Sequence, residues 1–407
     1  DLLEASDVRT GDQVVAQAVA LSSLDGSIID VLHDGLHLGV DFLSGPVDAL
    51  SVLSHFELGD GNAAGVDSLG RSDDHVLLLH QESQSVVGGR HVSSFAEELA
   101  SGKVVLRKIE GLTLENRVAV GKAVPDDVME EIKSCDVILK GPTTTPKGGS
   151  MGSANVTLRS ELDLYANVRP VCVPEEGIDW MFYRENTEGE YVLGSKGIEI
   201  PGTLAVDFKV TTEEGTKRIA RAAFDYAKNN GKTNVAIVTK ANIMKKTDGN
   251  FSAICREVAA NYPGIEAEDW YIDIMTANLV NKAIRNRFQV FVMPNLYGDI
   301  ITDEAAEIQG GVGTAGSANI GDRYAMFEAI HGSAPRMIEE GLADYANPSS
   351  IFKATEMMLR HIGFTDKADK LAEVLHICCD VEKSVVVTGM RDGGTCREFA
   401  EYMMSKL

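Results

Sequence analysis

Short apolar runs recur along the chain from about residue 102 onward, separated by longer stretches of mixed polarity. The runs "VILKGP" (137–142), "NVAIVTK" (234–240) and "VFVMPN" (290–295) are rich in aliphatic and β-branched residues. Short continuous apolar runs are typical of strands that are buried on both faces of a sheet. We therefore predict buried strands at these three places.

Two other stretches have the pattern of helices. In "TTEEGTKRIARAAFDYAKNNG" (211–231) the apolar residues fall on one face, and Thr211 with Glu214 predicts a capping box at its start. "PSSIFKATEMMLRHIG" (348–363) opens with a proline and closes with a glycine, which predicts another helix. Strands that alternate with helices indicate an α/β fold.

The first hundred residues do not follow this pattern. They contain no lysine, three arginines and 17 acidic residues, with six of the nine histidines and no tyrosine or tryptophan. Patches such as "VDALSVL" and "HVLLLH" show no sustained helical or strand period. Three interpretations stay open: a separate small domain, a solvated acidic arm, or a stretch not translated in the gene's true frame, which we favour.

Composition limits the class of protein. The chain has 407 residues and is 44% hydrophobic, enough for two domains or one large discontinuous domain. The net charge of −23 argues against nucleic acid or an anionic membrane as a partner. No apolar run approaches the length of a transmembrane helix. The six cysteines are scattered and we see no signal peptide, so we expect a reducing, cytoplasmic location.

Two groups of charged residues suggest binding sites, one for a cation and one for carboxylates. Asp299 and Asp303 stand four residues apart in "NLYGDIITD", where like charges on one helix face repel unless a cation lies between them. Arg159, Arg169 and Arg184 lie in "SANVTLRSELDLYANVRP" and "FYRENTEGEY", and guanidinium groups bind carboxylates in a bidentate way. Together they would suit a metal and a polycarboxylate. The alternative is that each residue forms an ordinary surface ion pair.

Seven motifs then occur in a fixed order: "LKGPTTTP", "SANVTLR", "DLYANVRP", "RENTEGEY", "KANIMKKTDG", "NLYGDIITD" and "FEAIHGSAP". The same motifs occur in the same order in the isocitrate/isopropylmalate dehydrogenase family of β-decarboxylating dehydrogenases, which residues 120–407 therefore resemble. The resemblance implies that family's α/β fold, with two domains and a discontinuous large domain. The large, cofactor-side domain would combine residues 102–164 with 310–407. Residues 165–309 would form the small domain, with a dimerisation clasp near 190–210, and residues 1–101 are left unmatched.

The resemblance implies roles for the charged residues. Asp299 and Asp303 would bind Mg²⁺ or Mn²⁺ together with Asp273 from the partner subunit of a homodimer with shared active sites. Hard cations of this kind prefer carboxylate oxygens. Tyr191 and Lys240 would be the acid/base pair, with Lys240 also contributed by the partner. A lysine beside a metal and arginines would have a lowered pKa, which suits a proton acceptor.

The implied substrate is isocitrate. By the resemblance, Arg159, Arg169 and Arg184 would clamp its carboxylates. Ser153 and Asn155 stand where members that act on isocitrate bind a third carboxylate, whereas members that act on isopropylmalate are more apolar there. Polar donors discriminate strongly for a polar substituent. The residues therefore favour isocitrate, with isopropylmalate as an alternative.

The implied cofactor is NAD or NADP, and the residues do not decide between them. The resemblance places these residues at the cofactor: Thr144 and Thr145 near the nicotinamide, the loop of His331, Gly332, Ala334 and Pro335, and Asn347 at the adenine. Arg336 follows the proline, where an acidic residue would indicate NAD and Lys-Tyr would indicate NADP. Arg336 could contact a 2′-phosphate.

The sequence departs from the family at its start. Members begin with a strand followed by "GDGIGPE", and only the fragment Gly59-Asp60-Gly61 resembles that loop. Without the strand, the large domain would lose a core element. We predict a metal-dependent, decarboxylating isocitrate dehydrogenase. A non-catalytic regulatory subunit of a hetero-oligomeric dehydrogenase, or a defective product, are the alternatives, although the metal-binding and acid/base residues are all present.

Overall fold

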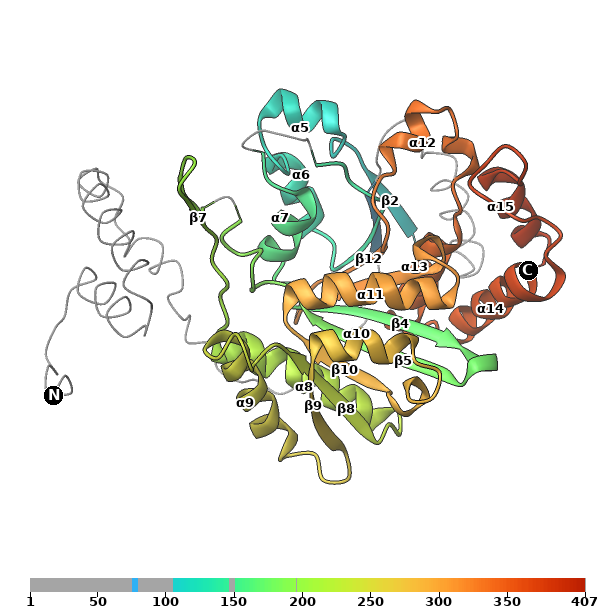
Figure 1. Cartoon of the computed structure of the whole chain (residues 1–407). Helices are drawn as coiled ribbons and strands as arrows, with labels where there is room; N and C mark the ends of the chain where they lie inside the picture. The colour runs from blue at the N-terminus through green and yellow to red at the C-terminus, as the bar shows by residue number, and fades with distance from the viewer. Residues whose placement is uncertain (1–74, 80–104, 146–150, 195, 407) are drawn as a thin grey trace, which may run out of the picture. The chain divides into compact units, whose positions relative to one another are not determined.

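The computed structural model describes the chain over residues 75–79, 105–145, 151–194 and 196–406, with side chains from Arg107 onward (Figure 1). These residues belong to one compact unit that spans 71–407. The fragment Gly59-Asp60-Gly61 lies outside the described residues. None of the helices in the described ranges is long and apolar enough to cross a membrane.

A ten-stranded mixed sheet forms the centre of this unit. Its order from edge to edge is β2 (Val105–Ile109), β1 (His75–Leu79), β3 (Val137–Lys140), β12 (Ala325–Ala329), β11 (Gly316–Ile320), β4 (Ala166–Val173), β5 (Ile178–Glu185), β10 (Val290–Met293), β8 (Asn234–Thr239) and β9 (Glu266–Tyr271). The first four strands are parallel to one another, as are the last four. Between the two parallel groups, β11 and β4 pair in antiparallel fashion. The three predicted strands are confirmed as β3, β8 and β10.

Strand β1 corrects the expectation that the first hundred residues supply no strand. Residues His75–Leu79 lie between β2 and β3 and pair in parallel with both, from His75 opposite Val105 to Leu79 opposite Lys140. A run of four apolar residues after His75 is too short to show a period, so the pattern could not separate a strand from an irregular segment. The first hundred residues therefore supply one strand of the sheet, although the sequence that follows it is not "GDGIGPE".

Helices cover both faces of the sheet and bury four apolar cores (Figure 1). At the β3–β12 end they are α5 (Leu114–Val120), α6 (Asp126–Lys133) and α7 (Ala154–Glu161) on one face, and α13 (Ser349–His361), α14 (Thr365–His376), the π-helix Ile377–Glu382 and α15 (Cys396–Met404) on the other. At the β8–β10 end they are α8 (Glu213–Asn229) and α9 (Thr247–Ala259) against α10 (Ile272–Val280) and α11 (Asn295–Gln309). Shorter helices are α12 (Pro335–Glu339) and the 3₁₀ turns Pro174–Glu176, Arg285–Arg287, Val312–Thr314 and Ala343–Tyr345.

Both predicted helices are present, with one correction at an end. Helix α13 begins after Pro348 and ends before Gly363, as the sequence predicts. Helix α8 begins after Thr212 rather than Thr211, because the Thr212 hydroxyl accepts the Gly215 N–H. Neighbouring threonines offer the same capping group, so the tertiary contacts of the preceding loop decide which one caps.

A two-stranded hairpin of β6 (Ile198–Ile200) and β7 (Leu204–Val206) projects from the main body within the predicted clasp segment (Figure 1). Gly189 and Val210 close its base through two backbone hydrogen bonds of 2.9 and 3.0 Å. The apolar cores at the two ends of the sheet draw on different parts of the sequence, but the sheet is continuous. The division into residues 102–164 with 310–407 and residues 165–309 stays a prediction.

Candidate active site

A pocket of about 200 Å³ gathers most of the predicted substrate residues. It lies among the N-terminal turn of α7, the start of α11 and the end of β12, and its lining includes Ser153, Asn155, Arg159, Arg169, Arg184, Tyr191, Asp299, Glu328, His331 and Gly332. These residues come from five motifs spread over about 180 positions of the chain. The folding of the sheet brings them to one place.

Arg184, near the end of β5, is the most enclosed of the three arginines. Its Nε and Nη2 donate to Asn295 Oδ1 at 3.0 and 2.6 Å, and its Nη1 pairs with Asp299 Oδ1. A Cβ added to Gly298 would come within 2.5 Å of the Arg184 stem, so only glycine fits this turn of α11. Burial, followed by the neighbouring cations Arg159 and Arg169, lowers the pKa of Arg184 to about 9. The group stays charged at neutral pH.

Arg169 of β4 contacts both carboxylates of α11. Its Nη1 lies 3.1 Å from Asp303 Oδ1 and donates to Thr302, and its Nη2 lies 3.7 Å from Asp299 Oδ1. The Arg169 side chain is 6% exposed, whereas the two aspartates are about half exposed. The aspartates therefore share one face of α11, as their spacing predicts, and that face looks toward the pocket.

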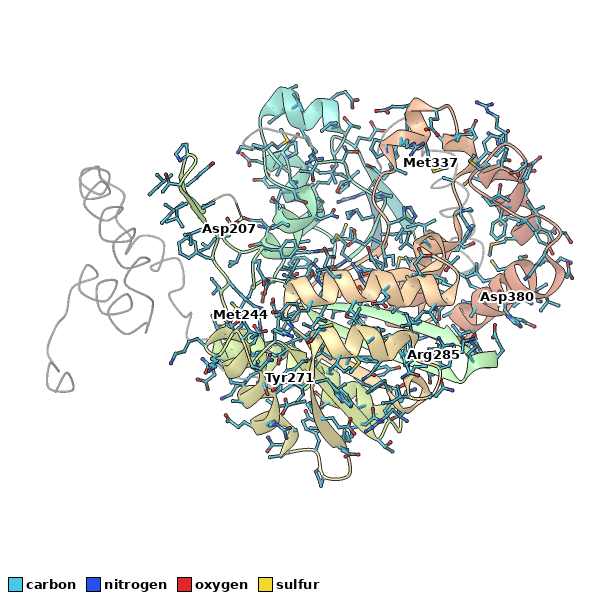
Figure 2. All side chains as sticks on the ribbon, in the orientation of Figure 1. Asp207, Met244, Tyr271, Arg285, Met337 and Asp380 are labelled. Carbon is cyan, nitrogen blue, oxygen red and sulfur yellow. The ribbon has the colours of Figure 1, made fainter. Side chains whose placement is uncertain are left out.

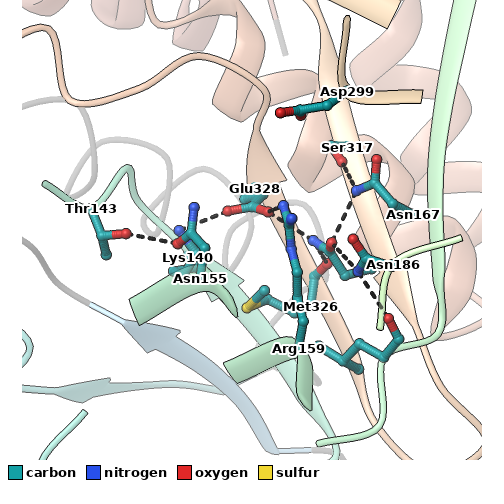
Figure 3. Close-up of polar contacts among 12 residues, drawn as sticks. Lys140, Thr143, Asn155, Arg159, Asn167, Asn186, Asp299, Ser317, Met326 and Glu328 are labelled. Carbon is teal, nitrogen blue, oxygen red and sulfur yellow. Dashed lines mark hydrogen bonds and ion pairs between the residues drawn. The ribbon is translucent and has the colours of Figure 1, made fainter. Parts of the chain in front are cut away.

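Arg159 meets a carboxylate that the sequence did not single out. Its Nη2 lies 3.3 Å from Glu328 Oε1, while Lys140 Nζ lies 2.7 Å from Glu328 Oε2 and Asn319 donates to Oε1 at 2.8 Å (Figure 3). Burial alone would raise the pKa of Glu328, but Lys140 and Arg159 outweigh it and hold that pKa at about 2. Glu328 thus neutralises part of the positive charge beneath the pocket and fixes Arg159.

Ser153 and Asn155 present polar groups at the N-terminal end of α7. Ser153 is the residue before the helix, yet its hydroxyl makes no capping hydrogen bond. Thr143 Oγ1 donates to Asn155 Oδ1 at 2.7 Å (Figure 3), which leaves the amide NH₂ as the donor for the pocket. Donors at a helix N-terminus favour an anionic ligand.

Tyr191 contacts the same carboxylate as Arg184. Its hydroxyl donates to Asp299 Oδ2 at 2.8 Å, and the Arg184 guanidinium lies 5.4 Å from its ring centre. Burial, together with the charge of Asp299, raises the pKa of Tyr191 to about 12. The phenol is therefore protonated at neutral pH, as a proton donor must be.

Lys240 and Asp273 form a second group apart from this pocket. Lys240 Nζ lies 2.6 Å from Asp273 Oδ1 and 5.9 Å from the ring of Tyr271, and neither charged residue lines the pocket. Tyr271 and Met244, which flank the pair, are exposed on the surface (Figure 2). Lys240 lowers the pKa of Asp273 through their hydrogen bond. The pair is therefore available to a second molecule.

The acidic residues fit a divalent cation in part. Asp299 and Asp303 place carboxylates together, but Asp273 does not join them: among the described residues no group of three His, Cys, Asp or Glu side chains could hold a metal. Burial raises the pKa of Asp303; it acts in the same direction on Asp299, where Arg184 and Arg169 outweigh it and lower the pKa. Two half-exposed carboxylates with room for other oxygens suit Mg²⁺ or Mn²⁺.

Two loops that meet beside the pocket carry Thr144, Thr145, His331, Gly332 and Ala334, whereas Arg336 lies in α12 and Asn347 lies just before α13. Thr144 Oγ1 donates to Ser333 at 2.6 Å, which joins the loop after β3 to the loop of His331, Gly332, Ala334 and Pro335. Thr145 and Arg336 are exposed. Arg336, in α12, pairs with Glu340, the residue directly after that helix, at an Nε–Oε1 distance of 2.7 Å. Asn347 caps the start of α13 by accepting the Ser349 N–H at 2.9 Å.

Sequence reasoning missed Lys140, Glu328 and Asn295. Two of them carried a signal: a lysine and a glutamate stand inside the apolar runs "VILKGP" and "AMFEAI", and a charge inside a buried strand requires a partner. Asn295 carried none, because an asparagine at the start of a helix is ordinary.

Comparisons with known proteins agree with this geometry. The profile of the isocitrate/isopropylmalate dehydrogenase family matches residues 104–397. The probable mitochondrial NAD isocitrate dehydrogenase subunit alpha of Drosophila melanogaster is 39% identical over 294 residues, 70% of this chain and 75% of that protein. The NADP isocitrate dehydrogenase of Rickettsia prowazekii is 42% identical over 282 residues, 65% of this chain and 56% of that protein.

The fold matches solved structures as well. The crystal structure of isocitrate dehydrogenase from Methylococcus capsulatus superimposes with a TM-score of 0.72 and 34% identity, covering 82% of this chain and 99% of that one. The family match begins at residue 104, so the first hundred residues stay unmatched, as the sequence predicts. The sheet, the gathered motifs and these comparisons lead to one conclusion: this chain belongs to the isocitrate/isopropylmalate dehydrogenase family.

Proposed function

We propose that the chain catalyses the metal-dependent oxidative decarboxylation of isocitrate to 2-oxoglutarate, with reduction of NAD or NADP. The observation that carries this proposal is the pocket in which Arg159, Arg169 and Arg184 converge beside the carboxylate of Asp299. The three buried guanidinium groups pair with Asp299, Asp303 and Glu328, and a tricarboxylate would supply anionic partners for the N–H groups that these pairs leave open.

The other end of the pocket favours isocitrate over isopropylmalate. Ser153 and the Asn155 NH₂ face it at the start of α7, and Val156 is the one purely aliphatic side chain of that turn that lines it. A third carboxylate would hydrogen-bond to these donors. An isopropyl group would cover these partly exposed donors without pairing them, and a polar group buried without a partner costs roughly 1–3 kcal/mol.

The same residues provide places for a cation and for protons. Asp299 and Asp303, with Asp273 of the partner subunit, would hold Mg²⁺ or Mn²⁺, which acidifies the substrate hydroxyl and stabilises negative charge on oxygen. A bound NAD or NADP would accept the hydride from C2, and Lys240 of the partner subunit would accept the hydroxyl proton. After CO₂ departs, the Tyr191 hydroxyl donates the proton that completes 2-oxoglutarate.

We also propose a homodimer with shared sites, and the position of Lys240 and Asp273 outside their own chain's pocket supports it. The helices next to them expose apolar residues that a partner would cover: Ile274 is 46% exposed and Val280 55% exposed on α10, and Ile300 is 61% exposed on α11. The two helices lie side by side (Figure 1). Large exposed aliphatic residues on adjacent helices are typical of a protein interface.

The test is a set of initial rates for the full chain with isocitrate or isopropylmalate, NAD or NADP, and Mn²⁺ or EDTA. We expect kcat/KM for isocitrate to exceed that for isopropylmalate by at least about a hundredfold, and EDTA to abolish the rate. Comparable rates on both substrates would refute the substrate. Isocitrate binding without turnover would favour the alternative function, a non-catalytic regulatory subunit. The cytoplasmic location stays a prediction.

A further inference from the structure

A buried ion pair lies at the base of the clasp, away from any proposed substrate contact. Lys209 Nζ lies 2.6 Å from Asp248 Oδ1; the Asp248 side chain is fully buried and that of Lys209 is 7% exposed. Lys209 directly precedes Val210, which closes the hairpin by pairing with Gly189. Burying two charges carries a desolvation penalty that their attraction only partly offsets. The pair therefore adds little to the free energy of unfolding, and stability alone does not explain why it is there.

Asp248 connects this pair to the proposed base. Its Oδ2 accepts the backbone N–H of Lys240 at 2.7 Å, at the point where β8 ends. Asp248 is the second residue of α9, so a rigid helix carries the acceptor. The position of the Lys240 backbone, and hence the reach of its side chain, depends on the Asp248 carboxylate.

The pair also contacts the two segments that carry the proposed acid and metal ligand. Lys209 Nζ lies 3.3 Å from Glu190 Oε1, and Glu190 directly precedes Tyr191. The ring centre of Tyr297 lies 4.2 Å from Lys209 Nζ, within range of a cation–π contact. Tyr297 stands on the first turn of α11, two residues before the metal-binding Asp299 proposed above.

We propose that Lys209 and Asp248 are a positioning pair that holds the acid, the metal ligand and the base in register. The inference rests on the proposed function, which gives Tyr191, Asp299 and Lys240 their roles. Because Tyr191 and Asp299 serve the chain's own pocket and Lys240 serves the partner's, one buried pair would set the geometry of two active sites. Neither Lys209 nor Asp248 would touch substrate.

The kinetic test uses the full chain with Asp248→Asn, Lys209→Met and the double variant. Asparagine keeps an oxygen for the Lys240 N–H but removes the charge. The matched control is Glu176→Gln, which breaks another enclosed ion pair, with Arg285, at the turns next to β5 and β10. We expect each single variant to lower kcat at least tenfold and to keep KM for isocitrate within about threefold of wild type. The double variant should lower kcat no further than either single variant. The control should keep kcat within about twofold of wild type.

Melting temperature and amide exchange separate positioning from stability. We expect peptides covering 189–210, 240–248 and 294–299 to exchange faster together in Asp248→Asn and Lys209→Met, and to be unchanged in Glu176→Gln, whatever its melting temperature. Wild-type kcat in Asp248→Asn, or faster exchange in only one of the three peptides, would overturn the proposal. Exchange does not depend on turnover, so a chain inactive on isocitrate would refute the proposed function while this readout still decides the positioning role.

Discussion

The arginine pocket and the Lys240–Asp273 pair differ in how their charges are compensated. In the pocket, Arg184 finds Asn295 and Asp299 within its own chain, and its side chain is 1% exposed. Lys240 and Asp273 are 25% and 66% exposed, and they compensate mainly each other. The proposed anion site is therefore organised within one chain, whereas the proposed base lies on the surface.

This difference separates two tasks of the proposed reaction. A substrate clamp gains from rigid, preorganised charges, because little reorganisation is then needed when the anion binds. A base contributed to a neighbouring molecule must be exposed in the isolated chain. The two regions should respond differently to mutation, and four experiments test that difference.

The largest effect should come from removing a positive charge from the arginine pocket. We predict that Arg184→Met lowers kcat/KM for isocitrate by about a thousandfold, roughly 4 kcal/mol, because it removes a buried, hydrogen-bonded charge from the anion site. Arg323→Met is the control, since Arg323 pairs with Asp136 at the surface and both side chains are 69% exposed. Steady-state kinetics and melting curves measure both. Similar losses in the two variants would show that the pocket is not the anion site.

The carboxylates proposed to bind the metal should give the next largest effect. We predict that Asp299→Asn weakens Mn²⁺ binding and lowers turnover about a hundredfold, since it removes a charged oxygen ligand. Asp322→Asn is the matched control, because Asp322 is exposed and lies outside the pocket. Calorimetric Mn²⁺ titration reports binding directly. Equal Mn²⁺ affinities in the two variants would exclude Asp299 as a ligand.

Glu328 tests whether the pocket balances its own charge. Its folded-state pKa of about 2 lies below the ordinary value for glutamate, so its contribution to stability is present above about pH 4.3 and is lost as the pH falls toward 2. We predict that Glu328→Gln lowers the free energy of unfolding by roughly 1–3 kcal/mol at pH 7 and by less at pH 3. Urea unfolding at both pH values measures this, with the exposed Glu373→Gln as control. An equal loss at both values would contradict the charge argument.

Mixing subunits tests the exposed pair. Lys240→Met and Tyr191→Phe should each be nearly inactive, and their mixture should recover up to about a quarter of wild-type activity. Half of the molecules would be heterodimers, in which one site carries both lesions and the other carries neither. Activity after subunit exchange, followed by mass spectrometry, is the measurement. Complete exchange without recovery would mean that Tyr191 and Lys240 of the same chain act together, which would contradict a site shared between subunits.

Much of the site could be predicted because helix geometry is local and because the motifs can be recognised directly in the sequence. Asp299 and Asp303 had to share a face of α11, since residues four apart on a helix lie together. The apolar runs of β3, β8 and β10 had to be buried, since both of their faces are apolar. The family resemblance supplied the roles, and the fold then brought the three arginines together as expected.

The order of amino acids was sufficient to predict the family, the main strands and helices, and the arginines and aspartates of the site. Only the tertiary structure decided that His75–Leu79 enters the sheet, that Lys140 and Glu328 pair beneath Arg159, and that Lys209 and Asp248 meet at the base of the clasp. The reason is physical. Periodicity reports which face of an element is buried, whereas a partner's identity depends on strand order and on loops that bring distant residues together.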